Sequence, residues 1–337
     1  MFTEAGEAAA VVAGQLAKNA VLIRELGAQL RRQEPRIIYT CARGSSDHAA
    51  TFAKYIFETR MRIGTVSQAP SISSVYGTGI RNMRESLFIV ISQSGRSPDI
   101  LRCAETAKAE GANVIAFVND ERSPLAEIAR VVVPLHAGPE TSVAATKSYI
   151  AALSAILHLV AEWSDDHELS EALATLGATL DAAWAADWSP AIKLYSGAES
   201  MFVLGRGLTL GIAQEAALKF KETCRLHAEA FSLAEVSHGP MALIEEGFPL
   251  LVFPPQDQAA FGARELIDTF AGRGAVVAAA GTRMDNVTCL PVQLGLHPAI
   301  APLAMIQSFY RLVNRLAFER GLDPDRPPRL SKVTETR

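Results

Sequence analysis

Short runs of apolar residues alternate with longer segments of helical periodicity along the first half of the chain. The apolar runs lie at residues 36–40, 86–91, 113–118 and 131–135. They lack polar alternation, which is typical of strands that are buried on both faces of a parallel sheet. Between them, apolar side chains recur every three to four positions, as on one face of a helix. The first half therefore predicts a parallel sheet that is covered by helices.

The same pattern then starts a second time. Residues 201–204 lead into Gly205-Arg206-Gly207, just as residues 37–40 lead into Ala42-Arg43-Gly44. Further apolar runs follow in the same order at residues 249–253, 275–280 and 288–294. The chain thus predicts an α/β fold of two pseudo-symmetric domains, each a flavodoxin-like parallel sheet between two layers of helices.

We expect this pattern to divide the chain into an arm, two domains, a linker and a tail. The helical arm covers residues 1–34, the first domain 35–165, the alanine-rich helical linker 166–200, the second domain 201–322 and the tail 323–337. The tail is rich in proline and then polar. It is therefore expected to lie over the surface.

Composition and charge narrow the class of protein. Hydrophobic residues make up 49% of the 337 positions and charged residues 20%, which is typical of a compact globular chain. The net charge of −4 gives no general attraction to nucleic acid or to anionic membranes, so any anion must be bound locally. The first residues include Glu4 and Glu7 and no basic stretch, unlike a signal peptide. We expect a cytoplasmic protein with no membrane span.

The four cysteines do not form a recognisable motif. Cys41, Cys103, Cys224 and Cys289 are far apart in the sequence, and no CxxC or Cys/His cluster is present. This spacing argues against a disulfide framework and a structural zinc site and fits a reducing compartment. Cys41 and Cys224 are interpreted as small buried hydrophobic residues. We expect no metal and no cofactor.

A polar stripe follows one face of the helix that is predicted after residue 207. Glu215, Lys219 and Glu222 lie three and four positions apart on this face. The stripe is either a solvated helix face with an ordinary ion pair or a set of acid–base groups. A loop is expected after the helix, and it carries His227 and ends with His238 in a rigid Gly-Pro turn.

A second candidate site follows the predicted strand at residues 86–91. Residues 92–97 read Ser-Gln-Ser-Gly-Arg-Ser, and Pro98 then occupies the first position of a helix capped by Ser97. Hydroxyls, backbone N–H groups and a helix N-terminus together suit a phosphate, although a polar turn with an N-cap would read the same. Residues 43–48, Arg-Gly-Ser-Ser-Asp-His, occupy the corresponding place after the first strand. They are not read as a hydrolase triad, because triad members are seldom neighbours in sequence.

Nucleotide-binding motifs are absent from the glycine-rich turns. Neither G-x-G-x-x-G nor G-x-x-x-x-G-K-[ST] occurs, so neither a dinucleotide fold nor a P-loop is supported. Two further segments remain candidates for ligand binding. Residues 141–147 are expected to open a long helix, and Lys332 lies in the tail.

Taken together, these motifs resemble those of the sugar isomerase (SIS) family. The resemblance covers almost the whole chain and is strongest toward the isomerase half of glucosamine-6-phosphate synthases and toward the SIS-type glucosamine-6-phosphate deaminases. The segments that carry it are Ser92-Gln93-Ser94-Gly95, Val143-Ala144 with Thr146-Lys147, Ala217-Leu218-Lys219-Phe220-Lys221-Glu222, His227-Ala228-Glu229-Ala230, His238-Gly239-Pro240 and Leu330-Ser331-Lys332.

The resemblance implies roles for individual residues. Glu222 matches the carboxylate that moves a proton between C1 and C2 of the sugar, and Lys219 matches its neighbouring ammonium group. His238 matches an imidazole that helps to open the sugar ring and is supplied by the other subunit of a homodimer. Lys332 matches a tail lysine that closes over the sugar and can form an imine with a ketose. The sugar phosphate is matched to Ser45, Ser46, Ser92, Gln93, Ser94 and Ser97, and a backbone contact to the sugar is matched to Val143.

Three departures from the synthases favour a deaminase. Arg96-Ser97 stands where the synthases have Glu-Thr, and Ala145 stands where they have serine. Phe2 stands where the glutamine-hydrolysing domain of the synthases has its cysteine. Without that domain to supply ammonia, release is the easier reaction. We therefore expect glucosamine 6-phosphate and water to give fructose 6-phosphate and ammonia.

Several alternatives stay open at this point. The substrate is a hexosamine 6-phosphate or ketose 6-phosphate, and the sequence allows a related aminosugar phosphate, a sugar phosphate glycated on an amino acid, or amination of the synthase type. A sugar-phosphate-sensing module is a different class of protein. A sensor does not need Glu222, His238 and Lys332, and a DNA-binding segment is not evident.

Overall fold

The computed structural model describes residues 1–330 and Lys332. The chain forms two compact units, which are described one at a time. The N-terminal unit comprises residues 10–140 and 147–174 with Lys332, and the C-terminal unit comprises residues 1–9, 141–146 and 175–330. The division into arm, domains, linker and tail expected from the sequence stays a prediction.

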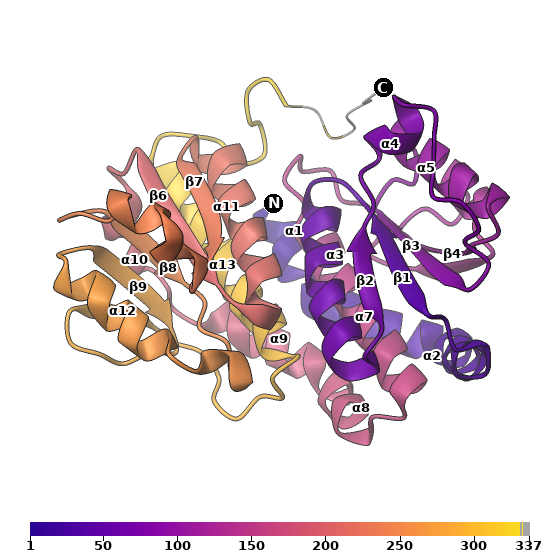
Figure 1. Ribbon diagram of the computed structural model, residues 1–337. Helices are drawn as coiled ribbons and strands as arrows, with labels where there is room; N and C mark the ends of the chain where they lie inside the picture. Colours follow the sequence, from indigo (N-terminus) through magenta and orange to yellow (C-terminus); the bar gives the residue numbers. More distant parts are fainter. Residues whose placement is uncertain (331, 333–337) are drawn as a thin grey trace. The chain divides into compact units, whose positions relative to one another are not determined.

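A five-stranded parallel sheet forms the centre of the N-terminal unit (Figure 1). Its strands are β1 (Ile37–Cys41), β2 (Gly64–Ser67), β3 (Ser86–Ser92), β4 (Asn113–Val118) and β5 (Val131–Pro134). They are arranged in the order β2-β1-β3-β4-β5. The strand order reverses between β1 and β3, so the carboxyl ends of these two strands form the switch point at which open α/β sheets bind ligands.

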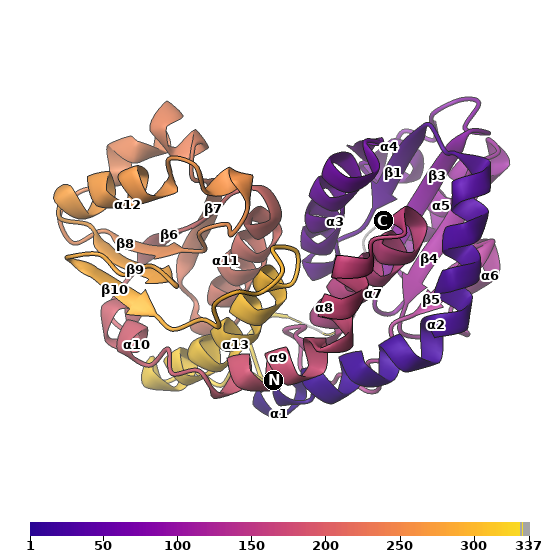
Figure 2. The same ribbon diagram turned by 90° about the horizontal axis from the view of Figure 1, so that it is seen from below.

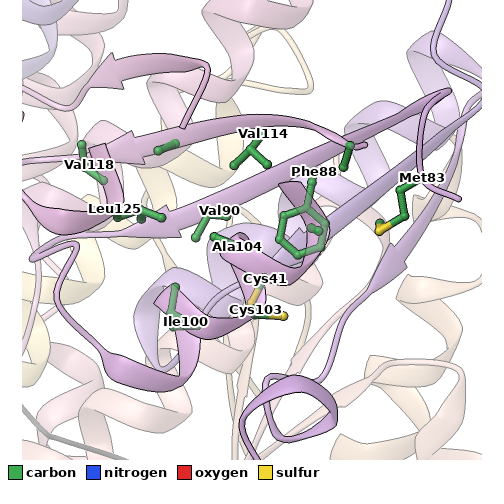
Figure 3. Close-up of a cluster of buried hydrophobic side chains, with 13 residues drawn as sticks. Cys41, Met83, Phe88, Val90, Ile100, Cys103, Ala104, Val114, Val118 and Leu125 are labelled. Carbon is green, nitrogen blue, oxygen red and sulfur yellow. The ribbon is translucent and has the colours of Figure 1, made fainter. Parts of the chain in front are cut away.

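Helices cover both faces of this sheet. They are α2 (Ala8–Gln33), α3 (Ser45–Ile56), the π-helical turn η1 (Phe57–Met61), α4 (Ser71–Ser74), α5 (Pro98–Ala109), α6 (Pro124–Ile128), α7 (Lys147–Ser164) and α8 (His167–Ala174). On one face, Phe88 and Val90 of β3 pack with Ile100 of α5 and Leu125 of α6 (Figure 3). Helix α2 lies along β5 (Figure 2). There the Asn19 amide donates a 2.8 Å hydrogen bond to the carbonyl of Pro134.

The C-terminal unit repeats this topology. Its parallel strands are β6 (Ser200–Gly205), β7 (His227–Ser232), β8 (Pro249–Val252), β9 (Val276–Ala280) and β10 (Val287–Leu290). Their order, β10-β9-β8-β6-β7, is that of the first sheet with β6 in the place of β1. The prediction of two pseudo-symmetric parallel α/β domains is therefore confirmed.

The helices of the C-terminal unit complete its two layers. They are α1 (Phe2–Gly6), α9 (Leu176–Ala185), α10 (Pro190–Tyr195), α11 (Leu210–Cys224), α12 (Ala263–Gly272) and α13 (Ala301–Glu319), with 3-10 turns η2 (Gly207–Thr209), η3 (Glu235–His238), η4 (Pro240–Leu243) and η5 (Gln258–Ala260). Helix α11 packs against α13 (Figure 1). Between them, the ring of Phe220 meets that of Phe309 edge-on at 5.1 Å. On the other face, Ile267 and Phe270 of α12 join a core with Leu250 and Val252 of β8.

Two segments differ from the sequence expectation. Residues 227–232, expected as a loop, form the edge strand β7, whose exposed His227 and Glu229 flank the buried Ala228. This polar alternation suits a strand with one solvated side and was masked by the helical pattern before it. The long helix expected from residue 141 begins instead at Lys147, the first residue of α7. The carboxylate of Glu4 accepts hydrogen bonds from the backbone N–H groups of Thr141 and Ser142, which holds this stretch outside a helix.

None of the described helices is both long enough and apolar enough to cross a membrane.

Candidate active site

The 92–97 loop leaves the sheet at the carboxyl end of β3. Ser92, the last residue of β3, is buried, and its hydroxyl accepts a 3.1 Å hydrogen bond from the N–H of Gly95. Gln93 and Ser94 are half-buried. Ser97 occupies the N-cap position of α5 as expected, but its hydroxyl makes no capping hydrogen bond among the described residues. That hydroxyl and the N-terminus of α5 can therefore serve an anion.

Gly95 fixes the shape of this loop. Its φ of 62° lies in the left-handed region, which residues with a side chain adopt at a cost. A Cβ atom here would lie 2.2 Å from the Ser123 hydroxyl oxygen, too close for any real contact. The N–H of Leu125 also donates to the Gly95 carbonyl at 3.2 Å. Both the conformation and the space thus require glycine, and the loop is held against the start of α6.

The 43–46 turn lies beside this loop, because β1 pairs with β3 in the sheet. Ser45 and Ser46 begin α3 and are half-buried, and Gly44 before them has a φ of 55°. The guanidinium of Arg43 donates two hydrogen bonds, of 2.9 and 2.7 Å, to one carboxylate oxygen of Asp99 in the first turn of α5. This ion pair ties the turn after β1 to the helix after β3.

Asp99 is almost fully buried, whereas Arg43 is about half exposed. The carboxylate therefore anchors the guanidinium at the carboxyl edge of the sheet, where an anionic ligand would add a second negative charge. Arg96 in the 92–97 loop is also paired, at 2.8 Å to Asp120. The hydrogen bond from Arg96 holds the pKa of Asp120 below its ordinary value.

Helix α11 carries the second group of predicted residues, the α11 ion cluster of Glu215, Lys219 and Glu222. The Lys219 ammonium lies 2.5 Å from a carboxylate oxygen of Glu222 and 3.3 Å from one of Glu215. The side chains of Lys219 and Glu215 are fully buried, and that of Glu222 is 18% exposed. The solvated helix face considered from the sequence is therefore wrong.

Burial alone would favour a neutral Lys219 by lowering its pKa. The carboxylates of Glu215 and Glu222 outweigh that effect, and the pKa of Lys219 is raised above its ordinary value. Lys219 thus remains a cation at neutral pH. The α11 ion cluster thus places a buried cation in contact with a partly exposed carboxylate.

Tyr310 of α13 extends the α11 ion cluster. Its hydroxyl lies 3.2 Å from the Glu215 carboxylate and donates a hydrogen bond to it. The chain from Tyr310 through Glu215 and Lys219 to Glu222 therefore links a fully buried tyrosine to a carboxylate that is accessible to solvent.

His238 lies in the same unit, at the end of the 3-10 turn η3, and is exposed. The following Gly239 has a φ of 144°, and Pro240 begins η4. The rigid turn expected from Gly-Pro is present. Among the described residues, no hydrogen bond is seen from His238 to the α11 ion cluster.

Residues 141–146 form an irregular segment of the C-terminal unit. Val143 is half-buried within it, between buried Ser142 and buried Ala144. The N–H and hydroxyl of Thr141 both donate to Glu4, at 2.5 and 3.0 Å. The backbone around Val143 is therefore held by α1.

Lys332 is anchored within the N-terminal unit. Its ammonium lies 3.2 Å from a carboxylate oxygen of Glu140, whose side chain is fully buried. That carboxylate also accepts a 2.6 Å hydrogen bond from the hydroxyl of Ser148 and a 3.2 Å bond from its N–H. Lys332 is thus a paired cation, and not a freely solvated one.

Four residues at these sites were not identified from the sequence as contributors: Asp99, Tyr310, Glu140 and Glu4. Asp99 could have been found, because an acid in the first turn after one strand faces the turn after the neighbouring strand. The other three make contacts to residues 95 to 192 positions away in the chain, and no local pattern indicates such contacts.

Comparisons with known proteins agree with this arrangement. The SIS domain family profile matches residues 30–162 and 194–279, more than half of the chain and both sheets in large part. The glutamine–fructose-6-phosphate aminotransferase of Pyrococcus horikoshii is 32% identical over 317 residues, which cover 90% of this chain and 52% of that protein. The chain thus spans about half the length of the curated relatives it matches.

Among the solved structures, two examples are similar over nearly the whole chain. One is a protein of Silicibacter pomeroyi DSS-3 that is named a phosphosugar isomerase, with 41% identity, a TM-score of 0.92 and coverage of 96% of this chain and 99% of that one. The other is the C-terminal domain of glucosamine-fructose-6-phosphate aminotransferase from Francisella tularensis, with 25% identity, a TM-score of 0.84 and coverage of 96% and 97%.

Proposed function

Because this chain belongs to the SIS domain family, we propose that it is a glucosamine-6-phosphate deaminase, which converts glucosamine 6-phosphate and water to fructose 6-phosphate and ammonia. The observation that carries the proposal is the 2.5 Å contact of the fully buried Lys219 ammonium with the partly exposed carboxylate of Glu222. A protein that only binds a sugar phosphate does not need a buried ammonium in contact with a carboxylate that is accessible to the ligand. The similarity to isomerase-type relatives supports the same class of chemistry.

The phosphate of the substrate is assigned to the 92–97 loop and the 43–46 turn. Ser94, Ser97, Ser45 and Ser46 offer hydroxyl donors, and Ser92 and Gln93 complete the set. The N-terminus of α5 adds backbone N–H groups and a partial positive charge. The switch point between β1 and β3 is where a fold of this kind is expected to bind a phosphorylated ligand.

The proposed chemistry begins with opening of the sugar ring, in which His238 moves the proton between the ring oxygen and the anomeric hydroxyl. The open chain has an aldehyde at C1 and an amine at C2. Glu222 then removes the proton from C2 while the C1 oxygen gains a proton, which gives an enolamine. Glu222 returns its proton to C1 while the nitrogen loses one, so that the aldose becomes a ketimine. Water adds to C2 of the ketimine, and ammonia leaves. The overall reaction consumes one water and releases one ammonia.

Lys219 and Lys332 have supporting roles in this proposal. The Lys219 cation is proposed to stabilise the negative charge that develops on the C1 oxygen as the enolamine forms. Lys332 belongs to the tail and is proposed to contact the sugar, with the buried Glu140 as the base that takes its proton when its amine reacts with a ketose. Val143 is proposed to offer its backbone to the sugar.

His238 is proposed to act in the other subunit of a homodimer. Its exposure in η3 fits a side chain that is offered to a partner. Each site would then need residues of two chains, as is possible in an isologous dimer.

The experiment is to incubate the purified protein with a panel of hexosamine 6-phosphates and measure released ammonia. Glu222→Gln keeps the shape of the side chain but cannot accept a proton, so kcat is expected to fall by roughly 10²–10⁴ while KM changes little. Glu265→Gln is the matched control, since Glu265 is an exposed carboxylate on α12 of the same unit. Undiminished turnover in Glu222→Gln would refute the assignment. Sugar-phosphate binding without any turnover in the wild type would favour the sensing module.

A further inference from the structure

Two of the four cysteines, far apart in sequence, meet inside the N-terminal unit. Cys41 is the last residue of β1, and Cys103 lies in the second turn of α5. Both are 1% exposed and belong to one core with Phe88, Val90 and Ala104 (Figure 3). Their thiols share a hydrogen bond. The sequence had offered only a hydrophobic role for Cys41 and none for Cys103.

The surroundings of the two sulfur atoms are unequal. The hydroxyl of Ser73, on α4, donates a 3.9 Å hydrogen bond to the Cys103 sulfur, which therefore accepts from both Ser73 and Cys41. The bond from Cys41 lowers the pKa of Cys103, with a further contribution from Ser73, against the effects of burial and the nearby Asp99. The same bond raises the pKa of Cys41, together with burial and Asp99, and the Arg43 guanidinium only partly offsets this. Because the Ser73 hydroxyl donates to its sulfur and would stabilise a thiolate there, Cys103 is the expected nucleophile of the pair.

A small cavity reaches Cys103. It has a volume of about 10 Å³ and is lined by Ser73, Cys103 and Gln68 among polar groups and by Met83 and Phe88 among apolar ones. That volume admits about one water-sized molecule. Hydrogen peroxide is close to water in size, whereas a disulfide reagent such as oxidised glutathione is far too large.

We propose that Cys41 and Cys103 form an oxidation site that hydrogen peroxide converts to a disulfide. The Cys103 thiolate attacks one peroxide oxygen, the O–O bond breaks, and hydroxide leaves, so that Cys103 becomes a sulfenic acid. The Cys41 sulfur then attacks the Cys103 sulfur and displaces the sulfenic oxygen as water, with the Cys41 proton. The two thiols lose two electrons and two protons in total, and one peroxide becomes two waters. Since an S–S bond is about 2 Å long, two hydrogen-bonded thiols need only a short approach.

The test is intact-mass spectrometry of the reduced full-length protein after hydrogen peroxide treatment, followed by a tryptic digest without reduction. We expect a loss of two hydrogens and a linked pair of peptides, residues 37–43 with residues 103–108. Cys224 is an internal control, because it is equally buried but its sulfur contacts Thr223 and the Val313 carbonyl and its pKa is raised to about 11 by burial. It should stay reduced. Oxidation confined to the more exposed Cys289, with Cys41 and Cys103 still alkylated after denaturation, would overturn the proposal.

Variants separate the two steps. In Cys41→Ser, oxidation should stop at a sulfenic acid on Cys103, seen as the gain of one oxygen in the intact mass, and in Cys103→Ser Cys41 should remain a thiol. Ser73→Ala keeps both cysteines and should slow formation of the linked peptides roughly two- to tenfold. An unchanged rate in Ser73→Ala, or a sulfenic acid on Cys41 in Cys103→Ser, would refute the assignment of Cys103 as the attacking thiol. Because mass is measured and not turnover, the result does not depend on the proposed function.

Discussion

Replacing Lys219 by methionine tests whether the α11 ion cluster is a buried network. Methionine keeps the length of the side chain and removes its charge. The fully buried Glu215 then loses an ammonium at 3.3 Å, and Glu222 loses one at 2.5 Å. Removing one partner of a buried ion pair costs about 3–5 kcal/mol, because the remaining charge is left in a poorly solvating medium. A pair on a solvated helix face would lose at most about 1 kcal/mol.

The pH dependence gives the prediction a second, independent readout. The pKa of Lys219 is raised in the folded state, so its contribution to stability is fully present below the unfolded pKa of lysine and is lost only as pH rises through the higher folded value. Lys219 therefore gives the wild type no pH dependence near neutrality. In Lys219→Met a buried carboxylate can relieve its cost by taking up a proton. The destabilisation should then shrink as pH falls, by up to about 1.4 kcal/mol per pH unit.

The assay is urea unfolding at mildly acidic, neutral and mildly alkaline pH. The matched control is the double variant Glu215→Gln with Lys219→Met, which removes the fully buried carboxylate together with its cation. It should recover much of the stability that the single variant loses and should depend less on pH. If Lys219→Met loses less than about 1 kcal/mol at every pH, the network does not behave as a buried one. In that case the reasoning that assigns a base to Glu222 loses its physical support.

Four further outcomes are expected. Ser94→Ala should raise KM, because a hydrogen bond to a charged phosphate is worth about 1.5–3 kcal/mol, and an unchanged KM would remove phosphate from the 92–97 loop. Removing the tail from residue 330 onward should leave the circular dichroism spectrum intact but abolish ammonia release, since Lys332 is lost; a fully active truncation would make the tail a surface extension only. Glu222→Gln and His238→Asn should each be nearly inactive, yet unfolding and refolding them together should restore activity in mixed dimers, unless His238 acts within its own chain. Burial lowers the pKa of His158 on α7 from 6.5 to about 4. Between these two pH values the imidazole is protonated in the unfolded state but not in the folded state, so the free energy of unfolding falls as pH falls. The loss should approach about 3 kcal/mol and be absent in His158→Gln, as measured by urea unfolding against pH.

Local patterns were sufficient to predict the central strands of both sheets. The seven residues of β3 are all buried. An uninterrupted apolar run is typical of a strand that helices cover on both faces of a parallel sheet. The turns after β1 and β3 were predicted for a related reason, since glycine and serine directly after a buried strand indicate where a chain leaves a sheet. Gly95 and its left-handed φ of 62° bear this out.

Contacts made by the tertiary fold were beyond local patterns. Strand β7 was missed because its alternating polar residues follow an uninterrupted helix. The spacing of the apolar residues therefore changes from helical to strand-like without a clear break. The start of α7 was misplaced because the competing hydrogen bonds come from Glu4, 137 residues earlier. Tyr310 and Glu215 are 95 residues apart, and Cys41 and Cys103 are 62 apart, and only the assembled layers bring each pair together.

The C-terminal unit is assembled from three separate stretches of the chain, and this has a consequence for synthesis. Helix α1 is synthesised early relative to its partners, since the amide of Gln307 that donates to the Ala5 carbonyl at 2.9 Å follows 302 residues later. Thr141, which binds Glu4, emerges between them. Residues 1–9 must therefore wait without their final neighbours until residue 307 has been synthesised. For the same reason, a gene cut between residues 174 and 175 would yield two fragments of which neither encodes a whole unit, and the C-terminal fragment should become stable only when the residues 1–9 and 141–146 are returned to it.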